Sequence, residues 1–142
     1  MIDHSLVIAR LTATGVFRQV GGAADATAVM AGNAPMGEGP AAFVVPVSDH
    51  PSQPITDSGM QTATVTFGVL VMVRKASDPT GATGLDPLKT VQNSLHAALL
   101  GWDGIDGYSA IWWAGGRILD LQPGAIWWLE EYSADTGIAP DF

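Results

Sequence analysis

A regular alternation of apolar and polar residues runs from Gly59 to Lys75 and predicts a long β-strand. Its odd-numbered positions form one apolar row: Ala63, Val65, Phe67, Val69, Val71 and Val73. A period of two is the spacing of side chains on one face of a strand. At about 3.3 Å per residue, such a strand spans on the order of 50 Å, more than a small sheet needs. We therefore expect its distal end to project as half of a hairpin with the preceding strand. In its second half Leu70 and Met72 are apolar too, so both faces should be buried there.

The N-terminal half carries shorter signals. We expect a helix from Asp3 to Thr14 that ends at Gly15 and has an apolar face made of Leu6, Ala9 and Ala13. A strand from Val16 to Val20 and one or two helical turns in AADATAVMA should follow.

The next segment, NAPMGEGP, is too rich in Pro and Gly for regular structure. Ala41 to Val47 is predicted to be a strand, with Phe43, Val44 and Val45 buried, and Pro46 favours an edge position or a bulge. The two strands should then be joined by DHPSQPITDS, a polar loop from Asp49 to Ser58.

The main packing helix is predicted between Asp86 and Gly101. Asp86 is a suitable N-cap and Pro87 a suitable first helical residue. One face is apolar at helical spacing: Leu88, Val91, Leu95, Ala98 and Leu99.

All five tryptophans lie near the C-terminus, and four of them form the adjacent pairs Trp112-Trp113 and Trp127-Trp128. Adjacent strand residues point to opposite faces of a sheet, so each pair places one indole on each face. Turn signals at Gly115-Gly116 and Gln122-Pro123-Gly124-Ala125 predict a three-stranded meander. Its register would pair Trp113 with Ile118, and Leu121 with Ile126.

In that register Trp112 and Trp128 share one face, and Trp113 and Trp127 share the other. We expect the main helix to cover one face and a second protein molecule to cover the other. One indole of each pair would then lie in the core and its neighbour at an interface.

Composition favours assembly over chemistry. A length of 142 residues predicts one domain, residues 1–142, with an α+β fold: a mostly antiparallel sheet, one main packing helix and short N-terminal helices. Charged residues make up only 14%, against about 25% in typical soluble domains, and weakly charged areas often become buried against partners. The net charge of −8 disfavours tight nucleic-acid binding. No signal peptide and no membrane-spanning run is evident.

No pattern predicts catalysis, a cofactor or a metal. The chain has no cysteine, and His4, His50 and His96 lack metal-ligand spacing. Asp103, Asp106 and Gly107 lack the ligand spacing of a calcium loop, and an Asp120–Glu131 acid pair lacks a cleft. We therefore expect no enzyme. Sugar stacking on the tryptophans is an alternative from another functional class, although a sugar platform needs only one wet face.

The predicted functional residues are instead contact residues. The Asp49–Ser58 loop lies at the projecting end of a strand that is longer than the domain needs. We therefore expect this loop to form an axial or lateral contact. The candidate interface residues are His50, Pro51, Gln53, Pro54, Ile55, Asp57, Trp112, Trp113, Trp127 and Trp128.

The order of several segments resembles the tail terminator proteins of long-tailed phages and proteobacterial prophages. These segments are FRQVGGAAD, PAAFVVPVSD, VTFGVLVMVR, LHAALLGW and GGRILDLQPGAIWWLEEY, and they cover nearly the whole chain. The resemblance implies an α+β subunit of a hexameric ring on the finished tail tube, which stops tube polymerisation and offers the surface that joins the head.

The resemblance also implies partners and a location. The partners would be further copies, the tail tube protein and a head-tail connector or stopper protein, with DNA passing through the lumen unbound. The location would be the head-proximal end of the tail in the virion, after assembly in the host cytoplasm. A tail tube protein or a head-tail completion protein is the neighbouring alternative.

Overall fold

The structure is a computed structural model that describes residues 1–31, 39–74, 85–122 and 125–139. It is an α+β fold dominated by one sheet, as predicted. The helices are α1 (His4–Ala13), α2 (Ala23–Met30) and α3 (Leu85–Leu99), with a short 3-10 helix at Thr56–Ser58. The strands are β1 (Gln19–Gly21), β2 (Gly39–Pro51), β3 (Gln61–Arg74), β4 (Trp112–Gln122) and β5 (Ala125–Ile138).

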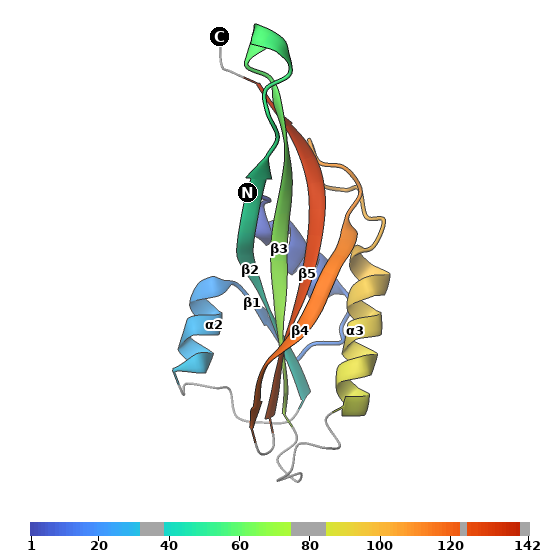
Figure 1. The fold of residues 1–142 in the computed structure, drawn as a ribbon. Coiled ribbons are helices and arrows are strands. Elements are labelled where there is room, and N and C mark those ends of the chain that lie inside the picture. The colour runs from blue at the N-terminus through green and yellow to red at the C-terminus, as the bar shows by residue number, and fades with distance from the viewer. Residues whose placement is uncertain (32–38, 75–84, 123–124, 140–142) are drawn as a thin grey trace.

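The five strands lie in the order β1-β2-β3-β5-β4, with β3 in the centre. β1 runs parallel to β2, and the other neighbouring pairs are antiparallel. The prediction of a long strand with a projecting hairpin is confirmed, because β2 pairs with β3 as far as Pro51↔Ala63 and this end extends past the helices (Figure 1). The Asp49–Ser58 segment is thus less of a loop than predicted: it begins inside β2 and ends in the 3-10 helix. The bulge expected at Pro46 is also confirmed by a register shift between Pro46 and Ser48.

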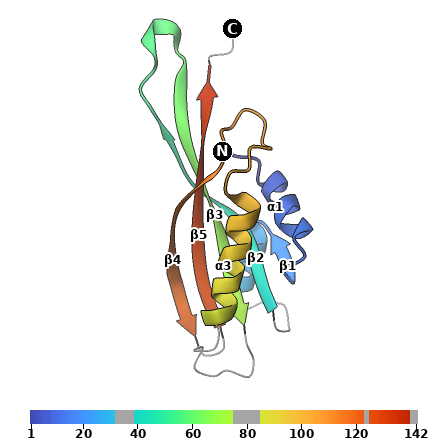
Figure 2. The same cartoon turned by 90° about the vertical axis from the view of Figure 1, so that its right-hand side faces the viewer.

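The main core lies between one face of the sheet and helices α1 and α3 (Figure 2). The apolar row of β3 and the five predicted α3 residues are all buried, as expected: Ala63, Val65, Phe67, Val69, Val71, Val73, Leu88, Val91, Leu95, Ala98 and Leu99. The helix begins at Leu85, two residues before the predicted first helical residue Pro87, so Asp86 lies in its first turn and is not the N-cap. Gly101, with φ +76°, follows its end as expected.

A second core lies on the other face of the sheet, beneath α2. Ala26 and Val29 of this helix pack with Phe43, Met72 and Trp127. The expectation that a second protein must cover this face is therefore wrong for the part under α2. The alanine-rich helix has small side chains that allow it to lie close to the sheet.

α1 forms where predicted, but its buried face differs. Asp3 is the N-cap and accepts the backbone N–H of Ser5 at 3.0 Å. Val7 and Leu11 are fully buried, whereas Leu6, Ala9 and Ala13 face outward. The predicted buried face of α1 is therefore wrong. It rests on apolar residues alone, and alanines fit an exposed helix surface as readily as a buried one. The strand predicted at Val16–Val20 is the shorter β1, and most of NAPMGEGP lies outside the described residues.

The predicted meander is wrong: β4 is one continuous strand, and Gly115-Gly116 lies inside it. Gly115 has φ +150°, and the register with β5 shifts between Trp113 and Gly115. The glycines therefore form a bulge in the strand instead of a turn. Leu121↔Ile126 pairs as predicted, although residues 123–124 of the second turn lie outside the described residues. Trp113 pairs with Tyr132 instead of Ile118.

Candidate functional site

The edge strand β4 exposes four large apolar side chains, which we call the β4 patch. Their exposed fractions are 40% for Trp112, 48% for Trp113, 49% for Ile118 and 45% for Leu119. Among the described strands β4 has only one neighbour, β5, so the other edge of β4 is open to pairing or packing. An apolar patch on an open sheet edge is typical of a surface that binds another protein.

Trp113 is held from inside the protein by a buried carboxylate. Its indole N–H donates to Glu130 Oε2 at 2.6 Å, and Glu130 is 0% exposed. Glu130 Oε1 accepts the indole N–H of Trp128 at 2.7 Å and the amide N–H of Gln92 at 2.5 Å. Three N–H donors therefore satisfy the charge of this carboxylate, as a buried charge requires.

Gly116 gives this carboxylate its space. A Cβ on Gly116 would lie 2.9 Å from Glu130 Oε1 and 3.1 Å from the Trp128 ring. Glycine thus allows β4 to pass close over the carboxylate and the Trp128 indole.

Tyr132 and His96 extend this network toward α3. The Tyr132 hydroxyl and His96 Nδ1 are 2.9 Å apart, and the His96 ring meets the Trp113 ring edge-on at 5.1 Å between centroids. Burial, and secondly the negative charge of Glu130, raises the pKa of Tyr132. The phenol therefore stays protonated and available as a hydrogen-bond donor. Trp113 is thus fixed both by a hydrogen bond and by an aromatic neighbour.

The four tryptophans divide between strands, not within each pair as predicted. Both indoles of β4 are exposed, whereas Trp127 is 8% exposed beneath α2 and Trp128 is half-buried. The shared faces also differ from the prediction. Trp113 and Trp128 reach the same carboxylate on the α3 side, and Trp112 is paired with Ser133 on the opposite side. The predicted register placed a turn at Gly115-Gly116, whereas β4 continues along β5 with register shifts at Trp113/Gly115 and at Ile118/Asp120, and this causes the change.

The projecting hairpin forms a second exposed surface. We call residues 52–60 the hairpin tip. The candidate residues His50, Pro51, Gln53, Pro54, Ile55 and Asp57 are all exposed. Apolar side chains also gather here: Ile55 and Met60 are 57% and 52% exposed and form an isolated β-bridge. Ser52 braces the base of the tip through its backbone N–H, which donates to the Thr62 carbonyl at 2.8 Å.

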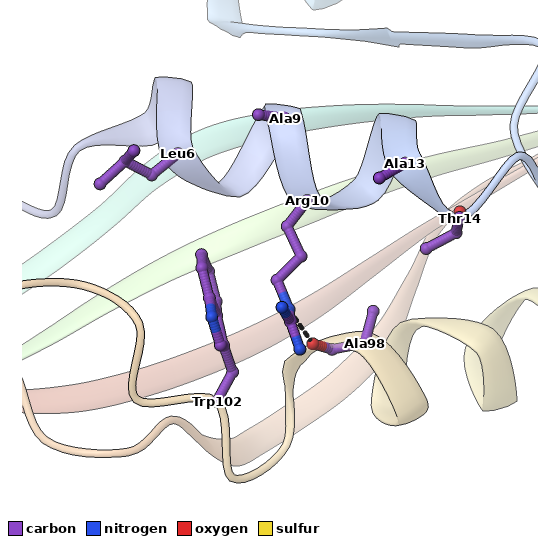
Figure 3. Close-up of a pocket in the computed structure, with 7 residues that line it drawn as sticks. All are labelled: Leu6, Ala9, Arg10, Ala13, Thr14, Ala98 and Trp102. Atoms are coloured by element: carbon purple, nitrogen blue, oxygen red, sulfur yellow. Dashed lines mark hydrogen bonds between the residues drawn. The ribbon is translucent and has the colours of Figure 1, made fainter.

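A third feature is an open apolar hollow between α1 and the end of α3, of about 490 Å³, which we call the α1 hollow (Figure 3). Its lining residues are Leu6, Ala9, Arg10, Ala13, Thr14, Ala98 and Trp102. Arg10 extends from α1 and donates through Nε to the Ala98 carbonyl at 2.6 Å. Its guanidinium lies 4.5 Å from the centroid of the Trp102 ring. The outward alanines of α1 therefore border a concave surface.

Comparison with known proteins identifies the family. The sequence model of the family described as phage tail terminator protein matches residues 1–140. The chain belongs to the phage tail terminator family. A search of curated proteins found no match. Membership in the tail terminator family gives the chain a structural role associated with the phage tail, and with it a place in the virion.

The resemblance read from the sequence is thus confirmed for this tail terminator family member. Its described residues contain no group of three or more His, Asp or Glu side chains placed to hold a metal ion. Within the same residues, no helix has both the length and the apolarity needed to cross a membrane.

Sequence reasoning missed two features of this family member. One is the buried carboxylate of Glu130, although a charge two residues from both Trp128 and Tyr132 on an otherwise apolar face is a sequence signal for a buried network. The α1 hollow left no comparable signal, because it is formed by two helices distant in sequence.

Proposed function

We propose that this protein is the terminator of a phage tail: copies form a ring on the completed tail tube, stop further polymerisation and present the surface that joins the head. The role is structural and not enzymatic, and residues 1–142 act as one tail-terminator-like domain. The observation that carries the proposal is the presence of separate apolar surfaces at the side and at the end of one sheet. A ring subunit that caps a tube needs both lateral and axial contacts.

The β4 patch supports the lateral contact. It lies along a sheet edge and contains two exposed tryptophans, and large aromatic residues contribute most of the energy at protein interfaces. Trp127, which is buried, and Trp128, which is half-buried, stabilise β5, the strand that holds β4 in place.

The hairpin tip supports an axial contact. It projects past the helices along the direction of the long strands, and Ile55 and Met60 give it an apolar surface (Figure 1). We propose that this tip contacts the tail tube protein or the head-tail connector.

The charge of the chain is compatible with a lumen that lets DNA pass. With 14 acidic and 6 basic residues, a ring of copies is strongly negative. Acidic walls repel phosphate groups, whereas clustered basic residues would hold them. DNA would therefore slide through the ring without specific binding.

The deciding experiment is to remove the gene from its phage or prophage and measure tail lengths by electron microscopy. We expect overlong or irregular tubes that do not join heads, and restoration of uniform, joined tails when the wild-type gene is supplied. Tails of normal length without heads would instead indicate a joining protein. Purified chain that polymerises into tubes by itself would indicate a tube protein, and a strict monomer with glycan-dependent tryptophan fluorescence would indicate a sugar-binding module.

The hairpin contact has its own test. Deleting residues 50–57 should leave the subunit folded, because these residues lie outside both cores, but unable to cap tubes. The double variant Ile55→Ser with Met60→Ser should show the same defect more mildly, and Val16→Ser, at an exposed apolar residue outside the hairpin, is the control. Uniform tails and infectious particles from the deletion would refute the contact.

A further inference from the structure

We infer that copies of this chain join head-to-tail, with the β4 patch of one copy seated in the α1 hollow of the next. The inference rests on the proposed function, because it identifies the lateral contact of the ring. It goes further by naming the second surface of that contact, on helices that the tail-terminator role does not otherwise use.

The β4 patch has the properties of an inserted surface. It includes both faces of an edge strand, since Trp113 and Ile118 lie on the α3 side and Trp112 on the opposite side. The Trp113 ring of this patch is already fixed in the free subunit by Glu130 and His96. A side chain held in its bound position loses little conformational entropy on association.

The α1 hollow has the properties of a receiving surface. Leu6, Ala9 and Ala13 of α1 face outward, although they are apolar, and the half-buried Trp102 ring stands across from them (Figure 3). Small side chains leave room for large ones from a partner. Arg10 is held in place by the Ala98 carbonyl and the Trp102 ring, so the hollow keeps its form without a ligand.

The location and charge of the two surfaces favour a second copy as the partner. They lie on opposite sides of α3, with β4 at one side of the molecule and α1 at the other (Figure 2). A contact between two different surfaces of the same chain is heterologous, and repeating it closes a ring when the rotation allows. The hollow contains the cation Arg10. Beside the patch lie two acidic residues, Asp120 and Glu131, and one cation, Arg117, which is 3.8 Å from Glu131, so the net charges of the two surfaces are opposite in sign.

Cross-linking tests this pairing directly, because the chain contains no cysteine. We would make Leu119→Cys in the patch and Ala9→Cys in the hollow, both at exposed positions, and treat the purified proteins with a short bismaleimide. In a mixture of the two single variants, the 14.7 kDa chain should be converted to a cross-linked dimer of twice that mass. No larger product should form, because each chain carries one cysteine. A chain carrying both cysteines should form a ladder of higher species. Leu119→Cys mixed with Ala28→Cys, on the exposed side of α2, is the matched control and should remain monomeric.

The same variants should be cross-linked within tails assembled in the host. Dimers from Leu119→Cys alone would indicate a symmetric β4–β4 contact and overturn the inference. Absence of the mixed cross-link both in solution and in tails would also overturn it. If those tails remain uniform and joined to heads, the terminator function stands and only the assigned contact is wrong.

Discussion

The half-exposed indole of Trp113 is tied to the fully buried carboxylate of Glu130 by a hydrogen bond of 2.6 Å. A residue of the outer surface is thus positioned by a charge in the interior. This connection links the stability of the fold to the form of the β4 patch. It also allows substitutions that separate the two effects.

Replacing Trp113 with Phe should remove one of the three donors to Glu130 while keeping an aromatic ring on β4. Hydrogen bonds to charged groups contribute about 1.5 to 3 kcal/mol, so we expect a loss of that size in the free energy of unfolding by denaturant titration. Trp112→Phe is the matched control, because the Trp112 indole makes no side-chain hydrogen bond with the described residues. The control should change stability by less than about 0.5 kcal/mol. Equal losses from the two variants would contradict the role assigned to Glu130.

Gly116→Ala should destabilise the protein, because the added methyl would lie within 3.1 Å of both Glu130 and Trp128. Overpacking of this kind costs about 1 to 3 kcal/mol. Gly137→Ala on β5 is the control, since no atom lies within 4 Å of its added methyl. At such a site alanine reduces the entropy of the unfolded chain and stabilises by about 0.4 to 1 kcal/mol. Thermal unfolding should therefore shift in opposite directions for the two variants.

The tryptophans of β5 and β4 should respond differently to truncation. Trp127→Ala leaves a cavity beneath α2 and should cost about 3 to 5 kcal/mol, a large part of the stability of a small domain. Trp112→Ala removes an exposed ring and should leave a folded subunit that assembles poorly. Circular dichroism reports folding and tail-length distributions report assembly. A folded Trp127→Ala variant with native stability would refute the location of the second core.

Acid should weaken the fold through His4. Burial lowers the pKa of His4 below its ordinary 6.5, and its Nε2 is buried without a hydrogen-bond partner among the described residues. The unfolded chain then binds a proton before the folded one does. The free energy of unfolding should therefore be unaffected by His4 above the ordinary pKa and fall as pH drops through it toward the folded-state pKa.

The measurement for His4 is denaturant unfolding at about pH 7.5 and pH 5.5, on either side of the usual histidine pKa. His4→Gln should show a smaller loss between the two conditions than the wild-type chain. An identical loss in both proteins would assign the acid sensitivity to other groups.

The sequence by itself determined the elements whose signal is local and repeated. The alternation in β3 and the helical spacing in α3 each identified both the element and its buried face, because one regular period over many residues leaves a single consistent orientation. The sequence also showed the family resemblance, in segments spread along nearly the whole chain. The candidate residues of the hairpin are all exposed, as the sequence predicts. A strand that is longer than the sheet and is followed by polar, Pro-rich sequence projects beyond the core.

Only the tertiary structure decided what depends on register and on packing between distant segments. Gly115-Gly116 is a turn signal in isolation, but β4 continues through it and pairs with β5 on both sides of a bulge, which takes up the extra residue. The two register shifts of β4, at Trp113/Gly115 and at Ile118/Asp120, together bring Trp113 and not Trp112 to Glu130. α1 shows the same limit: its alanines suit either environment, and the packing of Val7 and Leu11 against the sheet is what turned them outward to border the α1 hollow.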